Sequence, residues 1–310
     1  MSLIEQAAKR LEQLRQAGVE LPDEPEFAAR VVIQPALDTA ALKPKAISVG
    51  ETNNSGDVKL KTPPFSGPEV KLDLDAISAS GLLVPNAART QLADEFRVIK
   101  RPLIANAMGR GTEPVANGNL IMVTSALPGE GKSFSAINLA ISIAMELDNT
   151  VMLVDADVAR PSVLNMLGLP PSKGLLDVLQ NNSVDISGVL LRTNIEKLSI
   201  LPSGTAHPRA TELLASDTMI RLLDDMASRY SDRIIVFDSP PLLLTTESRV
   251  LATHMGQVVI VVNAENTVQS AVKQAISTIE ACPVKMMILN QIRTAKTDGY
   301  GYGYGYGHEK

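Results

Sequence analysis

A short stretch, ALPGEGKS from Ala126 to Ser133, combines two glycines with a lysine and a serine. Glycines let backbone N–H groups turn inward around an anion, a lysine after them can reach phosphate oxygens, and a serine hydroxyl can bind Mg²⁺. A helix beginning at this point adds partial positive charge. The stretch therefore predicts an ATP phosphate site, although its first position is Ala126 rather than glycine. The candidate ATP-binding residues here are Pro128, Gly129, Glu130, Gly131, Lys132, Ser133 and Phe134.

Two apolar runs end in aspartate. VMLVDADVARP carries Asp155 and Asp157, followed by Arg160, and RIIVFDSPP carries Asp238. One such aspartate would often be a helix N-cap, but two strand ends beside a phosphate loop indicate Mg²⁺ binding and phosphoryl chemistry. We expect Asp238 to bind Mg²⁺ together with Ser133. Arg160 either contacts phosphate or a neighbouring subunit, or forms a surface ion pair.

The carboxyl-terminal stretch GYGYGYGYG places a glycine on each side of four tyrosines. A tyrosine hydroxyl, with a pKa near ~10, needs a carboxylate to accept its proton during phosphoryl transfer. About 16 extended residues after Asn290 would reach roughly 50 Å, enough to enter the site of an adjacent subunit. Read alone, the repeat fits a passive low-complexity segment equally well. The candidate phosphoacceptors are Tyr300, Tyr302, Tyr304 and Tyr306.

The elements that must position these residues alternate along the chain. Helical stretches lie between most of the apolar runs, which predicts βαβ units. We therefore expect an α/β fold of the P-loop NTPase type, with a mostly parallel, doubly wound sheet and helices on both faces. Only 3% of residues are aromatic, as suits an aliphatic core buried on both sides of a parallel sheet. The strand-like runs begin at Leu120, Thr150, Leu198, Arg233, Gln257 and Val284.

The chain divides into residues 1–85, 86–295 and 296–310. In the first part, helical spacing over SLIEQAAKRLEQLRQAGV predicts an amphipathic helix, which is a solvated surface helix, a partner-docking helix or a membrane-surface helix. The Pro-, Ser-, Gly- and Lys-rich stretch that follows, to about Pro85, predicts a flexible linker. Helical periodicity resumes at Gln91, and Pro102 is expected to stop it. The third part is the Gly/Tyr tail.

The composition excludes several classes of protein. A formal net charge of −5 without a long basic block argues against nucleic acid as the main ligand. No apolar run approaches the ~18 to 20 residues that span a bilayer, so membrane association would need a partner or a surface contact. The single cysteine, Cys282, and the lack of a signal sequence predict a reducing compartment and a buried structural thiol.

Taken together, ALPGEGKS, LVDADVARP and IIVFDSPP resemble the Walker A, A′ and B motifs of the bacterial tyrosine kinases of capsule and exopolysaccharide systems. The second aspartate motif and the tyrosine-rich end carry most of this resemblance. The segment ILPSGTAHPRATELLAS adds to it, and the resemblance covers about Asn86 to Tyr306. The amphipathic start and the IKRPL segment look most similar to autokinases of exosortase-associated (PEP-CTERM locus) exopolysaccharide clusters.

The resemblance implies an ATP- and Mg²⁺-dependent protein-tyrosine autokinase that phosphorylates its own tail in trans and regulates exopolysaccharide polymerisation, chain length and export. Lys132 would neutralise the transferred group, and Asp155 would accept the tyrosine proton. Asp157 and Asp238 would hold Mg²⁺, although the roles of the first two aspartates can be exchanged. Asn290 stands where the wider family often contacts adenine.

The resemblance also implies partners. A family helix of the form E-x-x-R-x-x-R packs subunits into a ring, and its positions here are Asp94, Arg97 and Lys100. A membrane-embedded chain-length or copolymerase protein would act as activator and hold the chain at the cytoplasmic face of the membrane, and a phosphotyrosine phosphatase would reverse the reaction. The alternative is a dimerising ATPase switch similar to the MinD/ParA group. That group carries a second lysine where this chain has Leu127, which favours the kinase.

Overall fold

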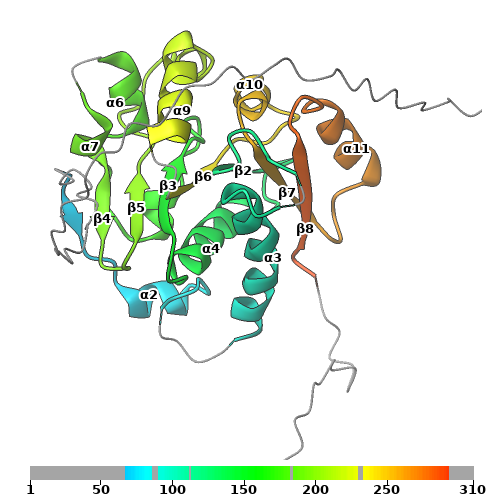
Figure 1. Cartoon of the computed structure of the whole chain (residues 1–310), viewed down its shortest axis with the longest axis horizontal. Coiled ribbons are helices and arrows are strands. Elements are labelled where there is room, and N and C mark those ends of the chain that lie inside the picture. The colour runs from blue at the N-terminus through cyan, green and yellow to red at the C-terminus, as the bar shows by residue number, and fades with distance from the viewer. Residues whose placement is uncertain (1–66, 86–89, 112, 182–183, 230–232, 293–310) are drawn as a thin grey trace, which may run out of the picture. The chain divides into compact units, whose positions relative to one another are not determined.

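The computed structural model describes residues 67–85, 90–111, 113–181, 184–229 and 233–292 (Figure 1). The predicted amino-terminal helix, most of the predicted linker and the Gly/Tyr tail lie outside these residues. In the described part, eight strands form one sheet in the order β1-β4-β5-β3-β6-β2-β7-β8. The strands are β1 (Glu69–Val70), β2 (Leu120–Ser125), β3 (Thr150–Asp155), β4 (Leu191–Thr193), β5 (Leu198–Leu201), β6 (Arg233–Asp238), β7 (Gln257–Asn263) and β8 (Val284–Asn290).

The sheet is almost entirely parallel. Only the pairing of β4 with β5 is antiparallel among the described strands. The six runs predicted as strands form β2, β3, β5, β6, β7 and β8, and every residue of β2, β6 and β7 is buried. Such runs, apolar on both faces, are typical of parallel sheets covered by helices on either side. The predicted α/β fold class is confirmed.

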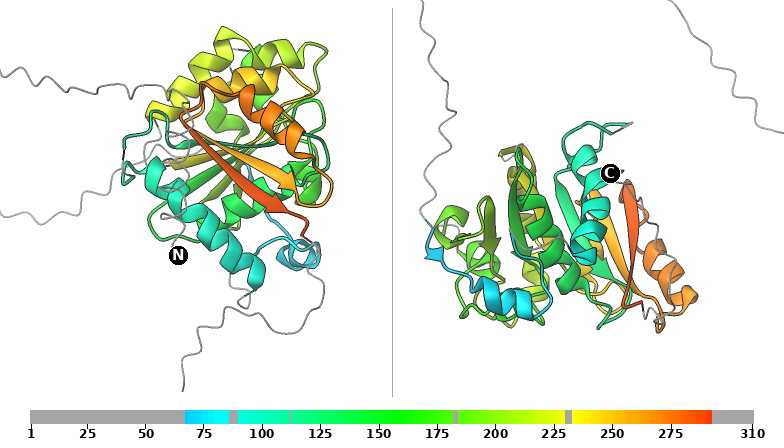
Figure 2. Two further views of the ribbon diagram at one scale, coloured as in Figure 1. Left: turned by 90° about the vertical axis from the view of Figure 1, so that its right-hand side faces the viewer. Right: turned by 90° about the horizontal axis from the view of Figure 1, so that it is seen from below.

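Helices form a layer on each face of the sheet (Figure 2). One core cluster contains buried residues of α2, α3, α4 and α5, and the opposite cluster contains residues of α6 to α11. Among the described residues, no helix is long and apolar enough to cross a bilayer. The helices are α2 (Leu74–Ala79), α3 (Gln91–Ala107), α4 (Lys132–Ala144), α5 (Val163–Met166), α6 (Leu175–Gln180), α7 (Ile186–Val189), α8 (Ala210–Leu214), α9 (Asp217–Arg229), α10 (Glu247–Thr253) and α11 (Gln269–Ser277).

The predicted linker is too long at its carboxyl end. Residues 67–85 form β1 and α2, and β1 extends the sheet by pairing with β4. Asn194 fixes this segment, since its side chain accepts from Leu72 N–H at 2.8 Å and donates to Leu72 O at 3.1 Å. The composition of the segment is loop-like, but four of its apolar side chains join the core. They are Leu72, Ile77, Leu82 and Leu83.

The prediction that Pro102 stops its helix is wrong. The helix α3 continues through Pro102 to Ala107. Beyond the proline, Leu103 is fully buried, and Asn106 Nδ2 donates to Gln257 Oε1 at 2.9 Å. These contacts offset the ~3 kcal/mol that an interior proline costs a helix. Cys282, as predicted, is a buried free thiol, and burial raises its pKa.

Candidate active site

The loop between β2 and α4, residues 126–133, is the phosphate loop. Two of its residues, Gly129 with φ +81° and Gly131 with φ +92°, have left-handed backbone conformations that favour glycine. Gly131 is the N-cap of α4 and offers no side-chain cap, so the first N–H groups of the helix remain available to an anion. The local structure is therefore the strand, glycine loop and helix arrangement that the sequence predicted.

A carboxylate within the phosphate loop holds its shape. Glu130 is only 2% exposed, and its Oε2 accepts from Leu127 N–H at 2.6 Å. Its Oε1 accepts from Asn263 N–H at 3.4 Å, at the end of β7, and from the Thr267 hydroxyl. The side chain of Glu130 therefore points into the protein and ties the loop to the segment after β7. Only the backbone of Glu130 remains for contact with phosphate.

The end of β8 contacts the phosphate loop from a second side. Asn290 Nδ2 donates to Glu130 O at 2.9 Å, and Gln291 Nε2 donates to Gly129 O at 3.0 Å. A Cβ at Gly131 would lie 2.1 Å from Asn290 Nδ2, so a larger residue would displace this amide as well as strain the backbone. The structure thus places Asn290 beside the loop, with its amide engaged by the protein.

The lysine of the loop points into a group of carboxylates. Lys132 Nζ lies 2.7 Å from Asp157 Oδ2, 3.9 Å from Asp238 Oδ1 and 3.3 Å from Ser133 Oγ. Burial alone would lower the pKa of Lys132, but Asp238 and Asp157 outweigh it and raise that pKa. The lysine is therefore a fixed positive charge where the phosphates of a nucleotide would lie.

The parallel register brings the two aspartate motifs together. Asp155 and Asp238 are paired residues of β3 and β6, at the carboxyl edge of the sheet. Asp238 is fully buried, and both its oxygens lack a well-formed hydrogen bond within the described part of the chain. Burial raises the pKa of Asp238 to about 6, against the opposing effects of Lys132 and the nearby Ser133 hydroxyl. With Lys132 no closer than 3.9 Å and no well-formed hydrogen bond from the described residues, this buried carboxylate leaves room for a second cation or a proton.

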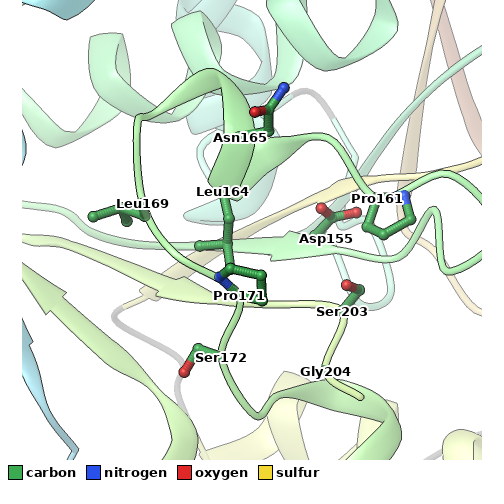
Figure 3. A pocket seen from close by; sticks show the side chains of 9 residues that line it. All are labelled: Asp155, Pro161, Leu164, Asn165, Leu169, Pro171, Ser172, Ser203 and Gly204. Carbon is green, nitrogen blue, oxygen red and sulfur yellow. The ribbon is translucent and has the colours of Figure 1, made fainter. Parts of the chain in front are cut away.

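Asp155 and Asp157 face different surroundings. Asp155 Oδ2 accepts from Ser162 and Val163 N–H, both at 3.1 Å, while its buried Oδ1 has no partner among described residues. Burial and the charge of Asp238 raise the pKa of Asp155 to about 7. Figure 3 shows this carboxylate on the wall of a cavity of about 210 Å³. The cavity is lined by Asp155, Pro161, Leu164, Asn165, Leu169, Pro171, Ser172, Ser203 and Gly204.

Asp157 instead lines a cavity of about 360 Å³ together with Lys132. Its Oδ1 accepts from Arg160 N–H at 3.1 Å. Pro128, Gly129 and the exposed Arg160 line the same cavity. The sequence left open which aspartate lies beside the lysine, and the structure places Asp157 there.

Two predicted site residues lie farther around the loop. Phe134 is half-buried, packs against the core and lines, with Asn290, a cavity of about 410 Å³ between α3 and β8.

Of the three residues predicted for subunit contacts, Arg97 and Asp94 form a partly exposed ion pair at 2.7 Å. Lys100 is different, because it is 5% exposed and donates to Ser142 O at 2.5 Å. Its expected role between subunits stays a prediction, and within one subunit these contacts already engage its ammonium group.

Several residues of this site were not predicted. Asn263, Thr267 and Gln291 hold the phosphate loop from distant parts of the chain, and Pro240, Pro241 and Leu244 line the cavity of Lys132. Asn263 could have been found, because it is a polar residue at the carboxyl end of an apolar strand. Leu244 carried no signal, since an isolated leucine after a strand is ordinarily a core residue.

Comparisons with known proteins agree with this geometry. A family model described as an AAA domain matches residues 118–292. The chain is 33% identical over 182 residues to the tyrosine-protein kinase YwqD of Bacillus subtilis, covering 58% of this chain and 75% of YwqD. It is 27% identical over 223 residues to the putative tyrosine-protein kinase CapB of Staphylococcus aureus, covering 71% of this chain and 93% of CapB. The crystal structure of the chimerical protein CapA2B2 aligns with a TM-score of 0.57 and 28% identity, covering 74% of this chain and 95% of that one.

Proposed function

This chain belongs to the bacterial tyrosine-protein kinases, and we propose that it transfers the γ-phosphoryl group of ATP to the tyrosines of its own tail, from one copy to another. One observation carries the proposal. Lys132 lies 2.7 Å from Asp157 and 3.9 Å from Asp238 at a cavity beside a phosphate loop. A cation, carboxylates and inward-facing backbone N–H groups at one place are the parts that phosphoryl transfer needs.

In the proposed reaction, the bond between the γ-phosphorus of ATP and the bridging oxygen to the β-phosphorus breaks. A new bond forms from the γ-phosphorus to the tyrosine oxygen, and ADP leaves with the electron pair of the broken bond. The phenolic proton passes to a carboxylate of the site. Lys132 and the N–H groups at the start of α4 hold the phosphate oxygens and stabilise the charge of the transferring group.

The geometry favours Asp157 as the acceptor of that proton, the second of the two assignments open from the sequence. Asp157 shares its cavity with Lys132, whereas Asp155 lines the other cavity. The ion pair of Lys132 with Asp157 must break when the lysine turns to the phosphate oxygens. The Asp157 carboxylate is then available to a hydroxyl entering the same cavity.

The residues present also fit Mg²⁺. Within the described ranges no three His, Cys, Asp or Glu side chains gather into a metal cage. Mg²⁺ does not need such a cage, since it is commonly bound by one or two carboxylates, waters and substrate phosphates. Asp238, buried without a well-formed partner, and Ser133 beside it would hold the ion, with Asp155 adjacent in register. Bound there, Mg²⁺ neutralises charge on the phosphates.

The biological setting is proposed by likeness to CapB and its relatives. The chain regulates exopolysaccharide polymerisation, chain length and export, at the cytoplasmic face of the membrane, together with a membrane-embedded copolymerase protein and a phosphotyrosine phosphatase. Copies of the chain assemble through the exposed side of α3, where Asp94 and Arg97 lie. The exosortase-associated subtype stays a prediction.

Incubation of the full chain with ATP and Mg²⁺, followed by anti-phosphotyrosine blotting, tests the function. The wild type should label, while Lys132→Met and the variant with all four tail tyrosines changed to phenylalanine should not. If the wild type binds nucleotide but never labels, the kinase assignment is wrong and the MinD/ParA-like switch takes its place.

A further inference from the structure

The cavity beside Lys132 has a mixed lining. Lys132, Asp157 and Arg160 give it charged side chains, and Pro240, Pro241 and Leu244 give it an apolar wall. Leu244 is 61% exposed, so its side chain is accessible to a ligand that enters this cavity. A cavity of about 360 Å³ with such a lining suits a ligand that is apolar along its body and polar at its tip.

The apolar wall belongs to a segment that is hydrogen-bonded to its neighbours. Within the segment after β6, Leu242 N–H donates to Ser125 O at 2.8 Å, and Pro240 O accepts from the Thr124 hydroxyl at 2.8 Å. Arg249 Nε donates to Leu242 O at 2.9 Å from α10. The segment is thereby fixed to β2, the strand that leads into the phosphate loop. Leu244 follows these anchored residues and lines the same cavity as Lys132, an arrangement that suits a recognition surface.

The tyrosines of the tail match this cavity chemically. A tyrosine carries its hydroxyl at the far end of a flat apolar ring, so the ring can lie on Leu244 while the hydroxyl reaches the charged side chains of the cavity. Serine and threonine cannot do both, since their hydroxyls lie next to the backbone. The glycines on each side of every tail tyrosine let a chain pass close above the wall without a Cβ in the way.

We propose that Leu244, supported by Pro240 and Pro241, is the platform on which the ring of the acceptor tyrosine from a second copy of the chain lies, and that it selects tyrosine over other hydroxyl residues. This inference rests on the proposed kinase function. Leu244 acts by positioning: it holds the ring so that the hydroxyl points toward Asp157 and the phosphoryl group, and it takes no part in the bond changes.

The test separates the enzyme chain from the acceptor chain. The enzyme is the full chain with its four tail tyrosines changed to phenylalanine, and the acceptor is the full chain with Lys132→Met. Into the enzyme we introduce Leu244→Ala, Leu244→Met or, as a matched control, Leu147→Ala, which alters an 86%-exposed leucine in the loop after α4. Phosphotyrosine formation is measured against the concentration of each substrate, giving KM for the acceptor, KM for ATP and kcat.

Leu244→Ala should raise the KM for the acceptor about tenfold relative to the KM for ATP, because the ring loses most of its apolar contact. Leu244→Met, which keeps an apolar side chain of similar length, should restore the acceptor KM, and Leu147→Ala should leave it unchanged. An unchanged acceptor KM in Leu244→Ala would overturn the platform, and a rise confined to the KM for ATP would assign the wall to the nucleotide instead. Absence of phosphotyrosine with unaltered Leu244 would overturn the kinase function itself, a distinct result.

Discussion

The carboxylate of Glu130 offers a sharp test of how the phosphate loop is built. A negative side chain inside a loop that binds phosphates would be harmful if it faced the ligand, but this one points away and accepts three hydrogen bonds. We predict that Glu130→Ala lowers both the stability of the domain and its affinity for ATP. Glu130→Gln should have a smaller effect on each.

The size of the effect follows from the partners. In Glu130→Ala, the N–H groups of Leu127 and Asn263 and the Thr267 hydroxyl all lose their acceptor. Each buried group left without a partner costs about 1–3 kcal/mol, and water entering the gap recovers part of this. A total of about 2–4 kcal/mol is therefore expected. In Glu130→Gln, one oxygen still accepts from Leu127 and the Thr267 hydroxyl can turn to accept, and only the long 3.4 Å bond from Asn263 N–H loses its acceptor, so the cost falls to about 1–2 kcal/mol.

Urea unfolding of the full chain gives the change in stability, and titration with a fluorescent ATP analogue gives the change in affinity. Because the loop must be ordered when ATP is bound, part of the stability that the loop loses appears as weaker binding of ATP. Each tenfold loss of affinity corresponds to about 1.4 kcal/mol. Thr267→Val is the matched control, because it removes only the hydroxyl contact with Glu130. In the double variant with Glu130→Gln, the two effects should not add.

The explanation fails if Glu130→Ala binds the analogue and unfolds as the wild type does. It fails in a different way if stability falls while affinity is unchanged, because the side chain would then support the fold without shaping the loop.

Two further predictions concern other contacts. Gly131→Ala should weaken binding of the ATP analogue at least about tenfold, because φ at this position is +92° and the new Cβ would lie 2.1 Å from Asn290 Nδ2. The double variant with Asn290→Ala should recover only part of the lost affinity, because the strained backbone remains. At Asp177, burial raises the pKa, but hydrogen bonds from Gly174 and Thr205 outweigh it and leave that pKa lowered. The stability that these bonds give is therefore present above about pH 4 and lost as the pH falls through the lowered pKa. Asp177→Asn should unfold more easily than the wild type in urea at pH 6, with the difference shrinking below about pH 4, and a constant difference would contradict this assignment.

The sequence predicted the parts of the site that depend on local pattern. Asp155 and Asp238 each follow an apolar strand, and parallel strands end at one edge, so their proximity required no further information. The glycines of the phosphate loop are equally local, because their conformations follow from the turn between β2 and α4. The strands that carry these residues begin where the periodicity placed them.

The remainder depended on tertiary contacts that a local pattern does not contain. Pro102 is tolerated because Leu103 beyond it is buried, and residues 67–85 are ordered because four scattered apolar side chains find the core. Lys100 looked like a surface charge, yet it pairs with Glu146 at 2.7 Å and lies against α4. Gln291 donates to Gly129 O, 162 positions away in the sequence, and neither composition nor the spacing of residues predicts a contact at that separation.

The contacts of Asn290 and Gln291 with the phosphate loop have a mechanical consequence. These residues end β8, and the chain that leads to the tail tyrosines starts next to them. If a neighbouring copy binds the tail, as in the proposed reaction, a force on the tail would act next to the two amides that donate to Glu130 O and Gly129 O. Binding of one chain's tyrosine would then be coupled to the nucleotide site of the chain that supplies it.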